Sequence, residues 1–207
     1  MKWLKSVSSC FLDRPCMAME KSHHMSHTSA NMLKIYKSKK SFGKLFIAIQ
    51  KDLKKILGDD CVIEHVGSTA IPGVDGKGII DVLIGFDNQE QIINAADKLL
   101  RHGYFSARKR LEDQKDRVSM YSSGEDTTIG DVHLHMVLKD SADFINFIKV
   151  RDFLRQNPDE AKKYSELKYK IAKETGFSRE EYKNQKSKFI EKILMKSKST
   201  EYSRTLN

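Results

Sequence analysis

Cysteine and long apolar stretches are both scarce in this chain of 207 residues. Its three cysteines, Cys10, Cys16 and Cys61, are odd in number and irregularly spaced, which excludes a disulfide-stapled secreted domain and favours a reducing cytoplasm. Cys61 opens an apolar strand, where a buried thiol is expected rather than a nucleophile. No apolar run is long enough to cross a bilayer, and the short one near the amino terminus is broken by serines and stopped by Asp13 and Arg14. The predicted location is therefore the cytoplasm.

Acidic residues are too few to balance the basic ones. The chain has 28 Asp and Glu against 37 Lys and Arg, a formal net charge of +9 and a pI near 9.3. Such an excess favours an anionic partner, whether a nucleotide, a nucleic acid or an acidic surface. The lysines are spread over residues 34–55, 162–173 and 183–198 without a dense cluster interleaved with aromatic residues, so nucleic acid is the less favoured partner. The composition fits one globular domain that can bury a core.

Apolar periodicity predicts a mixed α and β fold. Residues 41–57 have apolar positions at helical spacing, with Gly58 just past the end. Asn88 is a capping residue for a helix that runs to about His102. The other predicted elements are strands at 62–66, 79–86, 104–108, 117–121 and 129–138, a helix after Asp140, a helix that begins at Asn157 and Pro158, and a last helix capped by Ser178 and Glu181. We expect the three carboxy-terminal helices to cover the sheet.

A Gly-Ser turn stands between two of these strands, and an acidic residue follows within the second. Glycine at position 67 lets backbone N–H groups approach an anion, and the hydroxyls of Ser68 and Thr69 add two donors, so phosphate is the expected guest. Lys77 lies in the loop before Asp81 and could meet the same phosphate. Asp81 is costly to bury among apolar neighbours unless it is compensated, so it should emerge at a cleft. The alternative is an ordinary turn, with Asp81 accepting from nearby backbone amides.

The segment 131–138 alternates polar and apolar residues. Period-two alternation puts Asp131, His133 and His135 on one strand face. Two imidazoles at this spacing can bind a metal, move a proton or hold a phosphate. Zinc is not indicated by spacing alone, because the paired Cys patterns of zinc sites are missing. The alternative is a solvated strand face.

A series of residues in a fixed order extends from these motifs into the rest of the chain: Glu64 to Gly73, Lys77, Ile79 to Asp81, His133 to His135, Arg151 to Arg155, Pro158, Ala161, Tyr164, Leu167, Lys168, Tyr182, Lys186, Phe189 and Ile190. In these residues the chain resembles the GrpB family, whose fold belongs to the DNA polymerase beta-like nucleotidyltransferase superfamily. The resemblance implies an α/β (α+β) fold, a nucleotidyltransferase-like mixed sheet flanked by helices with a helical carboxy-terminal part. It divides the chain into a leader or extension at 1–31, the family domain at 32–196 and a polar tail at 197–207.

In that superfamily a Gly-Ser turn holds the phosphates of a nucleotide and carboxylates on the following strands hold divalent cations. The resemblance therefore implies Gly67, Ser68 and Thr69 as phosphate ligands and Asp81 as a ligand of Mg²⁺ or Mn²⁺. Active members usually carry a second acid two residues further on, and here that position is Leu83. Glu64 or the two histidines are then the candidates to complete a different catalytic site around Asp81.

Several basic residues in the helical part match the family pattern as well. Arg151 and Lys186 are candidate phosphate ligands, and Arg155 and Lys168 are weaker ones, because ordinary salt bridges explain most such residues. Tyr164, Leu167 and Tyr182 fit helix packing better than base stacking.

Two functions follow from these residues. The first is a metal-dependent nucleotidyltransferase acting on an unknown acceptor, in which Asp81, His133, His135 and Glu64 form the catalytic set. The second is a module without transfer chemistry that binds a nucleotide, a phosphorylated metabolite or a protein partner on the same fold, and it explains Leu83 directly. RNA binding by the lysine-rich surface is a third, weaker hypothesis.

Overall fold

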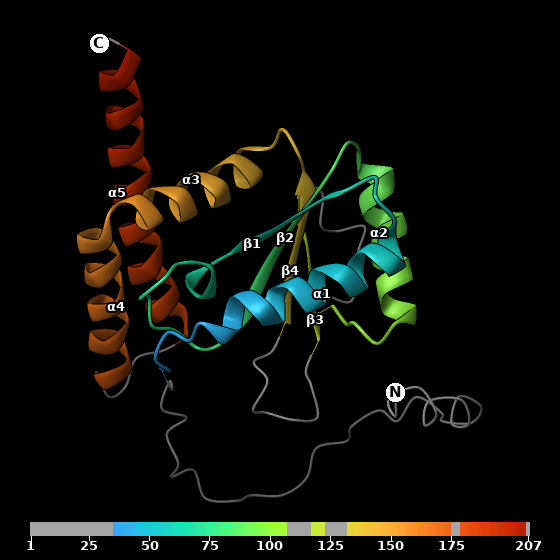
Figure 1. Cartoon of the computed structure of the whole chain (residues 1–207), viewed down its shortest axis with the longest axis horizontal. Coiled ribbons are helices and arrows are strands. Elements are labelled where there is room, and N and C mark those ends of the chain that lie inside the picture. The colour runs from blue at the N-terminus through green and yellow to red at the C-terminus, as the bar shows by residue number, and fades with distance from the viewer. Residues whose placement is uncertain (1–34, 107–116, 123–131, 175–178, 206–207) are drawn as a thin grey trace, which may run out of the picture. The chain divides into compact units, whose positions relative to one another are not determined.

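The computed structural model describes residues 35–106, 117–122, 132–174 and 179–205 (Figure 1). By its internal contacts the chain divides into Met1–Asn31 and Met32–Asn207, and every described residue belongs to the second unit. Its elements in chain order are α1 (Ser41–Leu57), β1 (Val62–Val66), the short 3₁₀ helix η1 (Ser68–Ala70), β2 (Ile80–Phe86), α2 (Gln89–Arg101), β3 (Arg117–Ser122), β4 (Val132–Leu138), α3 (Ala142–Gln156), α4 (Pro158–Lys173) and α5 (Arg179–Thr205).

The four described strands form one mixed sheet in the order β1-β2-β4-β3. β2 and β4 are parallel neighbours at its centre, whereas β1 and β3 pair antiparallel on the two sides. A parallel pair requires a crossover connection, which here contains α2 and β3. The parallel register sets Asp81 beside His133 and Leu83 beside His135, so the polar residues of two distant segments lie on neighbouring strands.

One face of the sheet is covered by α1 and α2. Alternate residues of β2, namely Ile80, Val82 and Ile84, pack on this face with Leu53 of α1 and Leu99 of α2. All five are fully buried, and each such side chain contributes about 1.5–3 kcal/mol when it leaves water. The period-two pattern of β2 therefore supplies the main core with one half of its residues and leaves the other half for the opposite face.

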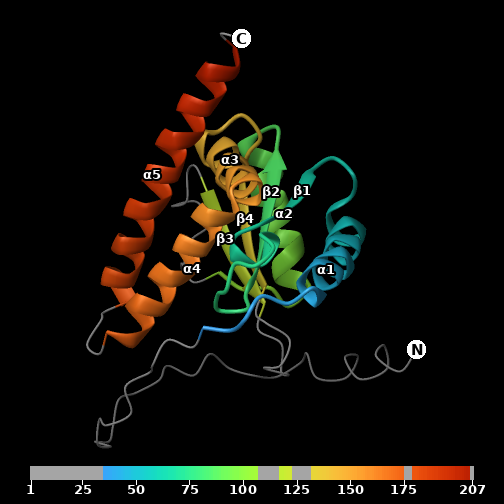
Figure 2. The same ribbon diagram turned by 60° about the vertical axis from the view of Figure 1, so that its left-hand side comes forward.

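The opposite face is covered by α3. Leu83 and Val137 of the central strands pack there with Val66, Phe144 and Phe147. α4 and α5 pack against α3, and in Figure 2 α5 runs along the outer side of α3 and α4 while α1 lies on the other side of the sheet. We expected all three carboxy-terminal helices to cover the sheet, but α3 is the covering helix and the other two form a layer outside it. The reason is a second apolar cluster in which α4 and α5 contact α3 and the loop after η1.

The loop between η1 and β2 is fastened to α4 through Asp75. The Asp75 carboxylate accepts from the Ser38 N–H at 2.8 Å and from the Tyr169 hydroxyl at 2.9 Å. The Asp75 N–H donates to the Ser165 hydroxyl at 3.0 Å, and Lys168 Nζ donates to the Asp75 carbonyl at 2.7 Å. Lys168 is only 2% exposed, so its amine is buried where it holds the backbone of the loop in place.

Most predicted elements are confirmed. α1 and β1 have the predicted bounds, and the Asn88 side chain caps α2 by accepting from the N–H of Gln91. The predicted strand at 104–108 is wrong within residues 104–106, where the only pairing is an isolated bridge between Phe105 and Tyr121. Residues 107–108, 129–131 and Ser178 lie outside the described part of the chain. The predicted fold class, a mixed sheet flanked by helices with a helical carboxy-terminal part, is confirmed.

Among the described helices, none combines the length and the apolar character needed to cross a membrane. Cys61 is half-buried just before β1, and burial raises the pKa of its thiol. A thiol with a raised pKa is a poor nucleophile near neutral pH.

Lys168 gives the fold a testable pH dependence. Burial, followed by the charge of Lys186, lowers the pKa of Lys168 from its ordinary 10.5 to about 7. Between these two values the unfolded chain binds the proton more tightly than the folded chain does, so the free energy of unfolding rises with pH in this window. We expect the stability of the native chain relative to Lys168→Met to increase by roughly 2 kcal/mol from pH 7 to pH 9 in urea unfolding.

Lys162→Met is the matched control for this experiment, because Lys162 is exposed on the same helix. It should leave the pH dependence of unfolding as it is in the native chain. A native chain whose stability runs parallel to that of Lys168→Met between pH 7 and pH 9 would show that Lys168 does not titrate there.

Candidate functional site

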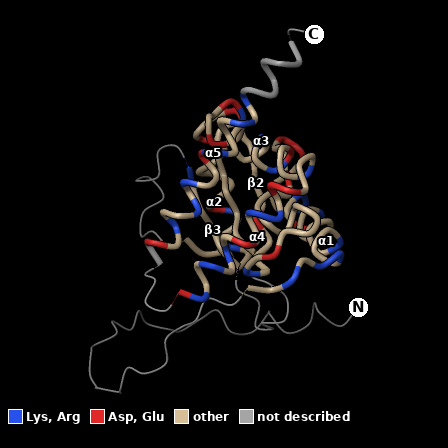
Figure 3. Tube along the Cα trace, turned by 90° about the vertical axis from the view of Figure 1, so that its left-hand side faces the viewer, with Lys and Arg blue, Asp and Glu red and all other residues tan. Residues whose placement is uncertain are grey.

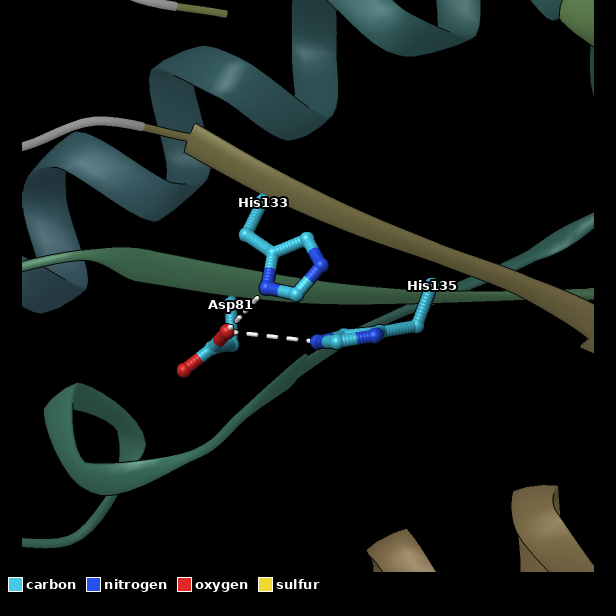
Figure 4. Close-up of side chains that lie close together, drawn as sticks. All are labelled: Asp81, His133 and His135. Atoms are coloured by element: carbon cyan, nitrogen blue, oxygen red, sulfur yellow. Dashed lines mark hydrogen bonds and ion pairs between the residues drawn. The ribbon is translucent and has the colours of Figure 1, made fainter. Parts of the chain in front are cut away.

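Asp81, His133 and His135 form a hydrogen-bonded cluster on the sheet face that α3 covers. His133 Nδ1 and His135 Nε2 each lie 3.2 Å from the same oxygen of Asp81, Oδ1 (Figure 4). The parallel pairing of β2 with β4 produces this convergence, because it sets Asp81 beside His133 and brings His135 next along the same face. The prediction that His133 and His135 share one strand face is confirmed, and Asp131 lies outside the described residues.

Arg117 of β3 determines which nitrogen of His135 carries the proton. Its Nη2 donates to His135 Nδ1 at 3.1 Å, so that nitrogen presents a lone pair. A neutral imidazole with a lone pair on Nδ1 has its hydrogen on Nε2, and this N–H then donates to Asp81. The bonds run from Arg117 through His135 to Asp81, and every member has a matching partner.

The electrostatics of the cluster favour a charged Asp81 and a neutral His135. Burial alone would raise the pKa of Asp81, but hydrogen bonds from His133 and His135, helped by the charge of Lys186, hold it well below its usual range. Burial lowers the pKa of His135 to about 4, assisted by the charges of His133 and Arg117 against the attraction of Asp81. At neutral pH the negative charge of Asp81 is therefore held by the neutral His135, by the hydrogen bond to His133 and by a nearby lysine.

His133 is placed by an aromatic neighbour as well as by Asp81. Its ring stacks on Tyr121 of β3, with centroids 4.4 Å apart and planes 15° apart. Its other nitrogen, Nε2, is buried and has no hydrogen-bond partner among the residues that the structure describes. An imidazole oriented by a carboxylate through Nδ1 has an Nε2 that can take or give a proton.

Gly67 closes the cluster from the side of β1. Its φ of 70° lies in the left-handed region that favours glycine, and a Cβ at this position would overlap the Asp81 carboxylate. The turn after β1 therefore passes directly over the Asp81 carboxylate.

The two hydroxyls after Gly67 lie beside the loop that leads to β2, and the hydroxyl of Thr69 is bonded within the fold. Thr69 donates to the Ile79 carbonyl at 3.1 Å and is 3.0 Å from His65 Nε2. Burial lowers the pKa of His65 to about 4, so His65 is neutral and donates to Thr69. Ser68 lies against Gly76, where an added Cβ would meet its Oγ at 2.9 Å. Both hydroxyls thus face the loop that leads to β2.

A cavity of about 490 Å³ opens beside the cluster, between the sheet, α3 and α5. Six of the predicted site residues line it: Gly67, Asp81, His133, His135, Arg151 and Lys186. The other predicted ligands, Glu64, Ser68, Thr69 and Lys77, are not among its lining residues. Lys77 instead lies over the Tyr182 ring, with Nζ 4.6 Å from the centroid.

Glu64 and Arg151 form an ion pair at the edge of this cavity. Arg151 Nη1 is 2.6 Å from a Glu64 oxygen and also donates to the His65 carbonyl at 3.2 Å, while Nε reaches Asp152 at 2.7 Å. The Glu64 carboxylate is thus occupied by a cation, and its contribution is to hold Arg151 against β1. Arg155 likewise serves the backbone, donating to the Ala70 carbonyl at 2.9 Å.

Lys186 reaches the centre of the site from α5. Tyr164 and Asp81 raise its pKa above the ordinary value, against the opposing effect of burial, so its ammonium group is charged. Tyr164 of α4 was predicted to serve packing, and it is indeed buried, but it also lines the cavity and raises the pKa of Lys186 through its electrostatic interaction with that side chain. The lysine retains accessible surface because it faces the cavity.

Six lining residues with polar side chains were missed by the sequence interpretation. They are Arg117 of β3, Asp143 and Asn146 of α3, and Lys183, Ser187 and Glu191 of α5. Lys183 is three residues before Lys186 on a helix, and that spacing puts both on one face, so it could have been found. Arg117 had no signal in the sequence, because its role depends on the pairing of β3 with β4.

The cluster does not fit a magnesium ion. Mg²⁺ takes six oxygen ligands, whereas the atoms that converge here are one carboxylate oxygen and two imidazole nitrogens. The position expected to supply a second carboxylate is Leu83, which is fully buried in the apolar cluster under α3. A set of two imidazoles and one carboxylate suits borderline ions such as Zn²⁺ or Fe²⁺.

Comparison with known proteins gives consistent relatives. A sequence model of the family described as GrpB protein matches residues 32–196. A UPF0157 protein of Vibrio cholerae is 36% identical over 135 residues, which cover 65% of this chain and 66% of that protein. The glutamate-rich protein GrpB of Alkalihalophilus pseudofirmus is 30% identical over 73% of this chain and 87% of its own length. The crystal structure of GrpB from Enterococcus faecalis matches 82% of this chain and 99% of its own at a TM-score of 0.69 and 26% identity.

The close approach of Gly67 to Asp81 predicts an unequal response to alanine at two glycines. Gly67 and Gly73 have similar φ values of 70° and 77°, but an added Cβ meets open space at Gly73 and the Asp81 carboxylate at Gly67. Gly73→Ala should cost about 1–2 kcal/mol for the left-handed backbone alone. Gly67→Ala should cost clearly more in urea unfolding, because the carboxylate must also move. Equal losses in the two variants would contradict the contact.

Proposed function

The chain belongs to the GrpB family, and from that premise we propose that its cavity binds a nucleotide or another phosphorylated metabolite. The observation that carries the proposal is the cavity lining, in which four basic side chains stand around the Asp81 cluster: Arg117, Arg151, Lys183 and Lys186. Guanidinium groups match the geometry of phosphate, and ammonium groups add charge. The volume of about 490 Å³ is in the usual range of small-molecule sites.

The basic side chains keep donors for a ligand although most of them have partners inside the protein. Arg117 uses Nη2 for His135 and has a distant contact of 3.6 Å with Asp143, which leaves further N–H groups on the same guanidinium. The lining holds four basic residues against three acidic ones, Asp81, Asp143 and Glu191. The negative charge of a phosphate group would offset this slight excess of positive charge in the lining. Its oxygens would bind best on the side of the cavity away from the negatively charged Asp81.

The cavity lining also contains apolar side chains. They are Ile71, Phe147, Val150, Ile190 and Leu194. A ligand with a flat or apolar part and an anionic part, such as a nucleotide, matches a lining that has both apolar and basic side chains. Inorganic phosphate alone would leave the apolar side chains uncovered.

A small ligand is favoured over a nucleic-acid strand. Figure 3 shows blue and red segments interspersed along the described part of the trace, without one continuous blue stripe in that view. Binding of a nucleic-acid backbone requires such a stripe or patch. The basic groups that converge are those inside the cavity.

A second candidate is nucleotidyl transfer to an unknown acceptor, favoured by the contact between Asp81 and His133. The imidazole of His133, which Asp81 orients through Nδ1, is suited to take the proton of an acceptor hydroxyl at Nε2. The superfamily that the family resembles uses divalent cations, Mg²⁺ or Mn²⁺, with Asp81 as the matching ligand. Leu83 and the poor fit of the cluster to Mg²⁺ place this candidate second.

Binding is tested by thermal unfolding of the full chain with ATP and with inorganic pyrophosphate, each in EDTA and in Mg²⁺. We expect stabilisation that persists in EDTA, since the proposed contacts are with protein cations. Lys186→Met should weaken the affinity about tenfold, the equivalent of ~1.4 kcal/mol for one charged contact. Lys188→Met, an exposed lysine on the same helix, is the control. Equal affinity in both variants, or no stabilisation by either compound, would contradict the proposal.

Transfer is tested separately by pyrophosphate release from each nucleoside triphosphate in Mg²⁺ or Mn²⁺. If the second candidate holds, release depends on Asp81, and Asp81→Asn lowers it at least about a hundredfold because the oriented imidazole is lost. Asp59→Asn, at a highly exposed acid outside the cavity, should keep the native rate. Binding of a triphosphate without release of pyrophosphate would contradict nucleotidyl transfer and would leave the binding proposal intact.

A further inference from the structure

Three potential metal ligands converge in the Asp81 cluster. Oδ1 of Asp81 is 3.2 Å from His133 Nδ1 and 3.2 Å from His135 Nε2, and the three atoms lie within 4.8 Å of one another (Figure 4). Ligands bound to one transition ion at about 2.1 Å are separated by roughly 3 to 3.5 Å, so little movement would be needed. Two imidazoles and one carboxylate are a ligand set of Zn²⁺ and Fe²⁺ sites that keep open positions.

Arg117 prevents His135 from acting as a metal ligand in this cluster. A metal at His135 Nε2 needs the lone pair of that nitrogen, and the proton must then sit on Nδ1. Ligating histidines donate this second N–H to a carboxylate, a carbonyl or water. Here Nδ1 faces the Nη2 donor of Arg117 at 3.1 Å, and two N–H groups would oppose each other. The hydrogen bond from Arg117 therefore fixes the tautomer of His135 that cannot bind a metal.

The Arg117 side chain could contact an anion in the cavity in place of His135. It lines the cavity, its side chain is 37% exposed, and its guanidinium lies over the Phe147 ring at 5.4 Å and near Asp143 at 3.6 Å. These contacts are loose, whereas an anion in the cavity offers the bidentate pairing that guanidinium prefers. Movement of Arg117 onto an anion would remove the donor from Nδ1 and let the His135 proton change nitrogen.

We infer that Asp81, His133 and His135 form a binding site for a divalent transition ion that Arg117 keeps closed and that an anion in the cavity opens. The closing by Arg117 stands on the geometry of the cluster alone, and the opening by an anion rests on the proposed function. Because each ligand favours the conformation that the other needs, the two bind with positive coupling, and the coupling must be equal in both directions.

The test uses Co²⁺ as the probe, since its visible absorption reports nitrogen ligation, on the metal-depleted full chain. Arg117→Met should bind Co²⁺ about tenfold or more tightly than the native chain, the scale of effects of residues around metal ligands. His135→Ala, alone and combined with Arg117→Met, gives the background from other histidines, including His23, His24 and His27. Thermal unfolding of Arg117→Met and of Arg117→Gln checks that the fold is kept.

Equal Co²⁺ affinity in the native chain and in both Arg117 variants would show that Arg117 does not keep the metal site closed. Co²⁺ binding to Arg117→Met that is unchanged by the added His135→Ala substitution would show that His135 is not a ligand, and would also overturn the proposal. The anion arm adds sulfate to the native chain, where we expect tighter Co²⁺ binding, and to Arg117→Met, where we expect no change. Tighter binding in Arg117→Met without any sulfate effect on the native chain would support the closed metal site and count against the anion site of the proposed function.

Discussion

The negative charge of Asp81 is the constraint on which the arrangement around the cavity depends. A carboxylate between apolar strands is tolerated only where donors and cations surround it. Two histidines from a neighbouring strand meet one of its oxygens, Lys186 approaches from the last helix, and Gly67 lets the turn after β1 pass over it. Each group comes from a different element, so the site forms only when β2, β4 and α5 are all in place.

Much of the fold follows from local patterns in the sequence. Helical spacing gave the bounds of α1, Asn88 marked the start of α2, and period-two alternation placed His133 and His135 on one face. These features depend on neighbours within a few residues. The order of the strands does not, and the pairing of β2 with β4 decides that Asp81 meets the histidines. The outer position of α4 and α5 was also missed, because it depends on which apolar face of α3 is left free.

The central residues of the site could be predicted from the sequence, whereas the surrounding ones could not. Asp81 and the two histidines stood out because a polar side chain on a buried strand costs free energy unless it has a partner or a function. Thr69 matched a phosphate-binding pattern equally well, yet its hydroxyl bonds to backbone and to His65, a use that sequence cannot distinguish from ligand binding. Glu64 was a candidate ligand, and it pairs with Arg151, 87 residues further along the chain. Arg117 shows the same limit, since only tertiary contact reveals its role.

The fastening of the loop at Asp75 has a consequence for the order of assembly. Its partners Ser165, Lys168 and Tyr169 lie 90 to 94 residues later in the chain, and the cavity is completed by α5 later still. During synthesis the sheet residues leave the ribosome before these helices, so at that stage the loop at Asp75 lacks its partners on α4 and keeps its contact with Ser38. Contacts of such sequence separation form late in folding. A nascent chain can therefore complete its core before it has any means of capturing a ligand.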